Sequence, residues 1–420
     1  MKRKLLFILA IIIFRLLLDW IYKYEIAPLY EYSGFEDYST SESQFLSYIY
    51  LAIFIPFVLW TIDNSNRLFT QFIVSFIFFL RIVPFTSLMM YIPQESFYIT
   101  SNFTYWLLLL ILLWFIKPQN PFGLLNKKKG DSEVIHIIAI VAVLTVLFVS
   151  GVYCNFRIHL NLEDVYELRL EAREFDMPKI LAYLLGATSN IIPILMIFYI
   201  SQKKKWIVYF LAFIGLMNFS IAGQKSTLFK ILICLGLFSL PNLNLKKILP
   251  WVFIFLGLIT VGEYICYETS FLSATIIRRG FFVTAFLDIE YFDYINLNGP
   301  TYFMDNIAFK LGEILGEEGL SANNGLFSDA YMNFGFGGCL AFPFIISYFI
   351  ALLEYISNKL DNSIKMFSAF VIVVTLASSS FTTSMLTHGL FLLAITLYFM
   401  PTNVEMNLKK KNKRIKNAKH

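Results

Sequence analysis

Two adjacent arginines, Arg278 and Arg279, carry side chains that match the oxygens of a phosphate group. They are followed by Gly280 and a run of aromatic residues, and no acidic residue occurs between them and Asp288. A guanidinium forms paired hydrogen bonds with phosphate, and neighbouring helix positions differ in direction by about 100°, so the two side chains would reach different places. The pair predicts a site for a phosphate-bearing ligand, and anchoring to lipid head groups is the alternative.

Lys225 lies in the segment AGQKST, at a tight turn between two apolar segments, and Gly223 permits that turn. Its ammonium supplies positive charge for an anion but lacks the planar fork of arginine. The alternative is a lysine at the end of a membrane span that merely extends its ammonium toward water. Both interpretations stay open on the residues alone.

The run from Ala322 to Gly338 reads ANNGLFSDAYMNFGFGG, a polar turn that leads directly into a long apolar segment. Asn323, Asn324 and Gly325 favour a turn. Ser328 is expected to cap the helix that follows. The N–H groups at the start of such a helix form a ready site for an anion.

Asp329 and Asn333 lie four residues apart on that predicted helix and therefore share one face. Asp329 already complements the helix dipole, which weighs against an anion there. It could instead orient an arginine or accept a proton from a substrate hydroxyl, and Glu268 and Glu317 are the other carboxylates placed to accept one. Three glycines are expected to allow close helix packing instead of doing chemistry: Gly335, Gly337 and Gly338.

Arg15 and Arg81 lie inside apolar segments, where an arginine costs several kcal/mol unless it is paired or hydrated. We interpret Arg81, which precedes Ile82-Val83-Pro84, as part of a structural pair or a cavity lining, in preference to a catalytic role. Arg169 lies in the densely charged segment 153–178. A solvated, salt-bridged surface helix is the alternative to ligand binding for that segment.

The composition places these residues in a membrane protein. The 420-residue chain is 58% hydrophobic and 15% charged, whereas soluble proteins carry about 25% charged residues. Twelve apolar segments are candidates to cross the hydrocarbon core as helices, and most of them have the roughly 17 to 25 residues that this needs. We predict an all-α polytopic membrane protein with about twelve transmembrane helices: 4–22, 45–62, 68–91, 102–116, 134–152, 179–200, 206–222, 226–241, 248–266, 328–356, 366–382 and 386–401.

The positions of Lys and Arg set the predicted orientation, because basic residues favour the cytoplasmic side. With the N-terminus inside, most basic clusters and the tail from Lys409 fall in the cytoplasm, whereas segment 23–44 falls outside and is acidic. Both termini are then cytoplasmic. The chain forms a single integral-membrane domain, 1–420, with a charged periplasmic loop at 153–178 and a large periplasmic loop at 267–327, before the tenth helix. Because this rule predicts few basic residues on the outer side, those that fall there are functional candidates.

Several function classes lack their motifs. No GxxxxGK[ST] sequence occurs, so ATP-driven transport by this chain alone is excluded. The four cysteines and four histidines show no metal-ligand spacing, so we expect no metal ion and no other cofactor. The basic tail is interpreted as a topology anchor that favours anionic lipid, and nucleic-acid binding is not expected.

The chain resembles the bacterial oligosaccharide repeat-unit polymerases, the O-antigen polymerase (Wzy-type) family. The resemblance covers most of the chain as a pattern of spans. Family members commonly have Gly, a basic residue and Ser close together where this chain has Gly223 to Ser226, often with Arg in place of Lys225. The resemblance is sharp at four places: DVYELR at 164–169, GQKS at 223–226, RRGFF through Tyr291 at 278–291, and 323–338.

The resemblance implies an enzyme that moves a growing glycan from its undecaprenyl diphosphate carrier. The acceptor is a sugar hydroxyl on a fresh lipid-linked repeat unit, at the periplasmic face of the bacterial inner membrane. Fixed cations would stabilise the departing diphosphate without a metal ion. The resemblance assigns catalytic roles to Arg278, Arg279, Lys225 and Asp329. It assigns substrate binding to Arg169, Tyr291, Asn323, Asn324, Asn333 and Arg81.

The expected partners are the lipid-linked donor and acceptor, the bilayer, a chain-length regulator and a flippase. The polymer would become O-antigen of lipopolysaccharide, capsule or exopolysaccharide. An O-antigen ligase shares the donor and topology, and the sequence separates it poorly from a polymerase. A lipid-linked oligosaccharide flippase would need charged groups along a central cavity, whereas the charges here gather at the outer face apart from Arg15 and Arg81.

Overall fold

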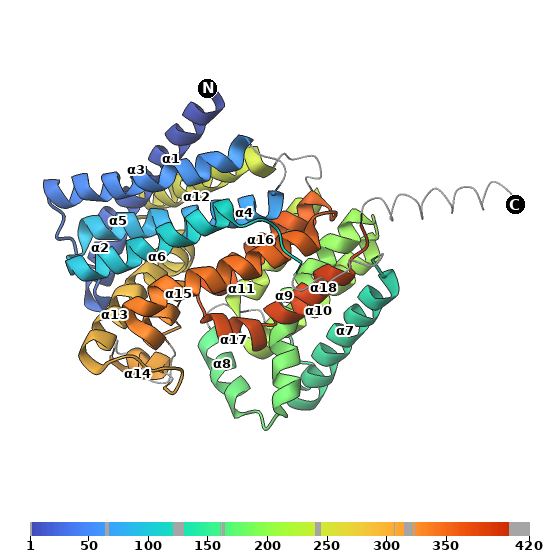
Figure 1. Ribbon diagram of the computed structural model, residues 1–420. Coiled ribbons are helices and arrows are strands. Elements are labelled where there is room, and N and C mark those ends of the chain that lie inside the picture. The colour runs from blue at the N-terminus through green and yellow to red at the C-terminus, as the bar shows by residue number, and fades with distance from the viewer. Residues whose placement is uncertain are drawn as a thin grey trace, which may run out of the picture. The chain divides into compact units, whose positions relative to one another are not determined.

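The computed structural model describes residues 2–63, 67–120, 130–159, 161, 164–239, 245–305, 307–314, 322–323 and 325–402. Every regular element in those ranges is a helix (Figure 1), which confirms the predicted all-α class. The predicted candidates Asn324 and Glu317 lie outside the described residues, as does the basic tail from Lys409. The chain packs as two compact units, of Met1–Lys117, Asn244–Ala351 and Val373–Phe381, and of Pro118–Leu243, Leu352–Ile372 and Thr382–His420.

In unit 1, α1 packs against α12, and α3 packs against both α4 and α5. The segment from α4 through α5 is almost entirely buried and forms the core of the unit. Its elements are α1 (Lys2–Ile21), η1 (Tyr22–Ile26), α2 (Ala27–Tyr30), η2 (Glu31–Ser33), α3 (Ser41–Asp63), α4 (Leu68–Ile77), η3 (Phe78–Ile82), α5 (Val83–Tyr91), α6 (Ser96–Phe115), α12 (Leu245–Tyr267), η5 (Ser273–Phe282), α13 (Val283–Asn298), α14 (Ile307–Ile314) and most of α15 (Leu326–Ser357). Three of these, η1, η3 and η5, are π-helical.

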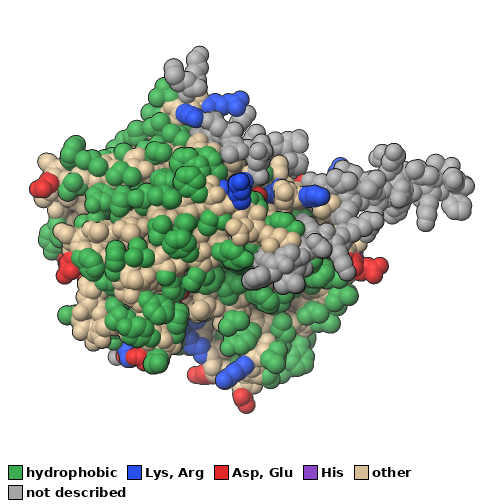
Figure 2. Space-filling view, in the orientation of Figure 1, with side chains coloured by type: hydrophobic (Ala, Val, Ile, Leu, Met, Phe, Trp, Pro, Cys, Tyr) green, Lys and Arg blue, Asp and Glu red, His purple; other side chains and the backbone are tan. Residues whose placement is uncertain are grey.

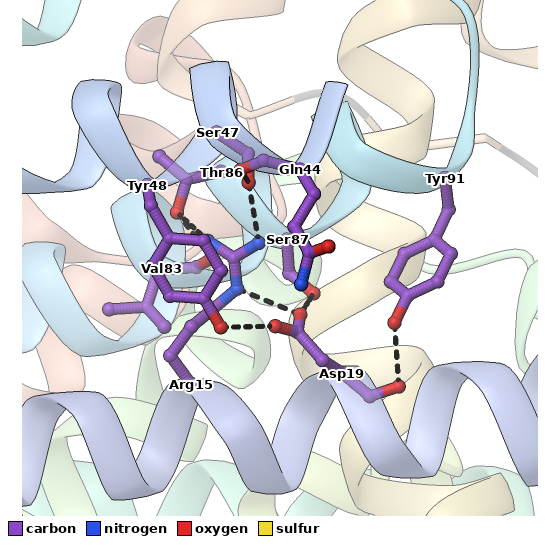
Figure 3. Close-up of polar contacts among 9 residues, drawn as sticks. All are labelled: Arg15, Asp19, Gln44, Ser47, Tyr48, Val83, Thr86, Ser87 and Tyr91. Atoms are coloured by element: carbon purple, nitrogen blue, oxygen red, sulfur yellow. Dashed lines mark hydrogen bonds and ion pairs between the residues drawn. The ribbon is translucent and has the colours of Figure 1, made fainter. Parts of the chain in front are cut away.

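A buried ion pair joins α1, α3 and α5 (Figure 3). Arg15 is fully buried and its Nε lies 2.8 Å from Asp19 Oδ1. Its other nitrogens donate to Thr86 and Ser47, and Asp19 also accepts from Ser87. Because every charged atom has a partner, this arginine has a structural role in holding the three helices together.

In unit 2, α9 lies at the centre and packs against α7, α10, α11 and α18. Of the residues that the resemblance assigns to this unit, Lys225 lies on α11, and Arg169 lies on α8, which packs against α10. The elements are α7 (Ser132–Cys154), α8 (Val165–Glu174), α9 (Lys179–Ser201), α10 (Lys205–Ala222), α11 (Lys225–Ser239), the end of α15, α16 (Asn362–Ala377) up to Ile372, α17 (Phe381–Leu386) from Thr382, and α18 (Leu390–Phe399).

Nine helices in the described residues are long and apolar enough to cross a membrane, and they match nine of the predicted spans. The other three predictions, 226–241, 366–382 and 386–401, fall on the shorter helices α11, α16 and α17 with α18. Large apolar side chains such as Phe148, Trp206 and Phe255 remain exposed on the long helices, and Figure 2 shows hydrophobic side chains spread over the visible surface. Long apolar helices with exposed apolar faces indicate a multi-pass membrane protein.

The helix α15 is broken at Gly335, whose φ of 54° and ψ of −141° are not helical. The break brings Gly338 against Ala330, so a Cβ on Gly338 would lie 1.9 Å from the Ala330 carbonyl oxygen. The predicted role in close packing therefore fits Gly338. Gly335 makes the turn instead, and a Cβ on Gly337 would meet nothing within 4 Å.

Candidate functional site

Arg278 and Arg279 lie on the π-helix η5, where the first is half-buried and the second is exposed. The Arg278 guanidinium stacks on the ring of Tyr30 from α2, with Cζ 3.9 Å from the ring centroid. Its Nε is buried and has no hydrogen-bond partner in the structure. Stacking fixes the plane of a guanidinium while its edge remains able to donate, so Arg278 is prepared for an acceptor that the described chain does not provide.

The contact between η1 and η5 buries a carboxylate that was not predicted from the sequence. Glu25, on the π-helix η1, is 1% exposed, and neither of its oxygens has a hydrogen-bond partner of good geometry. The Ser273 hydroxyl of η5 and the Ser270 backbone N–H lie beside it as donors. Buried polar groups are nearly always bonded, and Ser273 can donate to Glu25, so the Arg278 Nε is the group on η5 that points to a ligand. The one signal in the sequence is an acidic residue just after the first apolar segment.

Arg81 is almost fully buried on η3 and forms the predicted structural pair, with Asp288 of α13. Its Nη2 lies 2.5 Å from Asp288 Oδ2, and its Nη1 donates to the Ala377 carbonyl at 3.2 Å. Burial raises the pKa of Asp288, whereas the Arg81 charge opposes that rise. A buried pair of this kind positions helices and is not available to a ligand.

Ser328 was expected to cap a helix, and this prediction is wrong. The helix α15 begins two residues earlier, at Leu326, so Ser328 lies in its first turn. Its hydroxyl donates to Asp288 Oδ1, the carboxylate oxygen that does not contact Arg81. The serine therefore extends the buried pair and fixes the start of α15 against α13.

Asp329 and Asn333 contact each other, as their spacing predicts, with Asn333 Nδ2 3.0 Å from Asp329 Oδ1. The second oxygen of Asp329 accepts from the backbone N–H of Phe381 at 2.8 Å. Asn333 Oδ1 accepts from the backbone N–H of Phe303, where φ is 63°, in the strained left-handed region. In this state both side chains hold the backbone of neighbouring segments in place.

Tyr291 and Asn323 lie close to this group. The Tyr291 side chain is fully buried on α13 and its hydroxyl donates to the Ala322 carbonyl at 2.7 Å. Asn323, the next residue, is exposed. Tyr291 therefore positions the polar turn before α15, of which Asn323 is the described polar side chain.

In unit 2, Arg169 and Lys225 meet at the turn between α10 and α11. Gly223 has a φ of 59°, and a Cβ there would lie 2.8 Å from the Val165 carbonyl oxygen. Arg169 Nε donates to the Gly223 carbonyl at 3.1 Å, so α8 clamps the turn. Lys225 is the half-buried first residue of α11. Arg169 therefore positions the turn that presents Lys225.

The predicted residues fall into three groups. Arg278 and Arg279 lie on η5, where the Arg278 Nε has no hydrogen-bond partner, whereas Arg81, Tyr291, Asp329 and Asn333 belong to the packed start of α15. Arg169 and Lys225 form the third group, in unit 2.

No protein-family model, curated protein or solved structure matches this chain. A functional assignment therefore rests on these residues, their surroundings and the resemblance of the motifs.

Proposed function

We propose that this chain is a repeat-unit polymerase, which transfers a glycan from an undecaprenyl diphosphate carrier to a lipid-linked repeat unit. The observation that supports it most is Arg278, whose guanidinium lies on Tyr30 with a buried, unsatisfied Nε. The donor's diphosphate offers the oxygen acceptors that this group lacks. The exposed Arg279 next to it adds a second cation.

Glycan transfer from a diphosphate carrier depends mainly on stabilising the negative charge of the leaving diphosphate. The bond between the anomeric carbon and the diphosphate oxygen breaks through an oxocarbenium-like state, and the leaving diphosphate takes the electron pair. The half-buried Arg278 and the exposed Arg279 stabilise its charge. The acceptor oxygen bonds to the anomeric carbon and releases a proton. Both oxygens of Asp329 accept from N–H groups, so we assign the proton to Glu25, whose carboxylate lies beside the Ser273 hydroxyl of η5.

The proposal includes the topology that the basic residues predict. Twelve spans with both termini in the cytoplasm would place segments 153–178 and 267–327 in the periplasm. The second segment contains η5, α13 and α14. An outer location of η5 would bring Arg278 to the level of lipid head groups, where a carrier diphosphate lies.

Deletion of the gene in its host tests the proposal against its rivals. A polymerase mutant keeps a single repeat unit on its acceptor, and the surface glycan migrates as one short band on a gel. Loss of every repeat would favour a flippase or a ligase. Arg15 and Arg81 already count against a flippase, because their buried carboxylate partners leave no charge to line a cavity.

Substitution then tests the site. Arg278→Ala and Arg279→Ala should each abolish the polymer at an unchanged protein level, and Lys225→Ala tests separately the catalytic role that the resemblance gives to this cation of unit 2. Arg157→Ala is the matched control, because Arg157 is an exposed arginine whose partner is Glu171. The site assignment is wrong if both arginine variants polymerise like the control.

A further inference from the structure

A lysine of unit 2 is buried without a counter-ion. Lys230 lies on α11 and is 4% exposed. Its ammonium donates to Asn190 Oδ1 at 2.5 Å, and this is its one hydrogen bond in the structure. No carboxylate in the described part of the chain forms an ion pair with it. An ammonium has three donors, so two remain without an acceptor among the described residues.

The amide partner cannot balance the charge. Asn190, on α9, is neutral, and its Nδ2 donates to the His388 carbonyl at 2.8 Å, which turns its oxygen toward Lys230. The imidazole of His388 also lies near the ammonium and brings no negative charge. A buried cation that lacks an anion is costly, and within a membrane such a residue is by default a functional candidate.

The break between α17 and α18 lies next to Asn190 and Lys230. The helix α17 ends at Leu386 and α18 begins at Leu390, with Gly389 between them at a φ of 69°. The break is seated on α9, since a Cβ on Gly389 would lie 2.3 Å from the Ala187 Cβ. The first N–H groups of a helix have no intrahelical acceptor and carry partial positive charge. Gly389 offers no side chain to cap them.

We propose that Lys230, with the α17–α18 break, binds an oxyanion: a carboxylate or a phosphate group. The ammonium and the helix N-terminus both favour negative charge here, and the described residues supply none. The anion would accept from the two remaining ammonium hydrogens and from the N–H groups that begin α18. This site is independent of the proposed polymerase activity.

The test uses the full-length protein in neutral detergent, with inorganic phosphate as the probe. Phosphate is added against sodium chloride at constant ionic strength, and thermal unfolding is followed. The wild type should show a saturable rise in Tm of a few degrees. Lys230→Met should lose that rise. Without phosphate it should be at least as stable as the wild type, because an uncompensated buried charge has been removed.

Lys365→Met is the matched control, because Lys365 is a buried lysine of the same unit whose ammonium donates to the Asn358 carbonyl. It should keep the response to phosphate. Lys230→Gln retains a donor for Asn190 without the charge, so it replaces Lys230→Met in the experiment if that variant does not fold. It should also lose the response.

A second arm adds phosphatidylglycerol in place of inorganic phosphate. A response to the lipid alone identifies a head group as the source of the anion, and a response to inorganic phosphate identifies a soluble one. Either result supports the site if it disappears in Lys230→Gln. The proposal is overturned if neither probe stabilises the wild type more than that variant.

Discussion

At the scale of single residues, charged side chains in this protein divide by whether their partners are complete. Arg15 and Arg81 are buried and fully paired with Asp19 and Asp288. Arg278 and Lys230 keep donors that no described residue accepts from. Only groups of the second kind are available for ligands, since breaking a complete buried pair leaves an uncompensated charge.

This distinction predicts the outcome of a double-mutant cycle. Arg81→Met should destabilise the protein by about 3 to 5 kcal/mol, because Asp288 stays buried without its cation. Adding Asp288→Leu should restore most of the loss, although Ser328 then lacks its acceptor. Thermal unfolding of purified protein compares the variants. Asp288→Leu alone completes the cycle, and losses of the two single variants that simply add up in the double variant would mean that the pair contributes nothing as a pair.

At the scale of elements, the sequence predicted which segments are helical but not where the helices depart from regular α-helical geometry. The π-helical turns that carry Glu25, Arg81 and Arg278 have no compositional signature, because apolar periodicity does not distinguish a π-turn from an α-turn. The cap predicted at Ser328 failed because its acceptor, Asp288, comes from another helix. The turn at Gly223 was predictable, since glycine permits a positive φ.

The clamp of α8 on that turn can be measured with one substitution. Gly223→Ala adds a Cβ 2.8 Å from the Val165 carbonyl oxygen at a φ of 59°. Alanine in this left-handed conformation should lose about 1 to 2 kcal/mol for the backbone alone, and the contact with Val165 should raise the loss above that range. A loss in thermal unfolding that stays within about 1 to 2 kcal/mol would show that α8 does not press on the turn.

At the scale of the whole molecule, the fold class was predictable because lipid requires each backbone polar group to be bonded within its own helix. The pairing of side chains was not, since Arg81 and Asp288 are 207 residues apart and meet only through packing. Arg81 was still recognised as half of a pair, because an arginine in an apolar segment needs one. The unsatisfied Arg278 Nε on η5, by contrast, becomes visible only when neighbouring helices are in place.

The central claim, glycan transfer from a lipid diphosphate near Arg278, is tested most directly with purified components. Lipid-linked repeat units are extracted from a host that lacks this gene and are incubated with the protein in liposomes. The account predicts longer lipid-linked glycans and one undecaprenyl diphosphate released per linkage, and Arg278→Ala should give neither. It is contradicted if the folded wild-type protein leaves the repeat units unjoined, or if Arg278→Ala joins them at the wild-type rate.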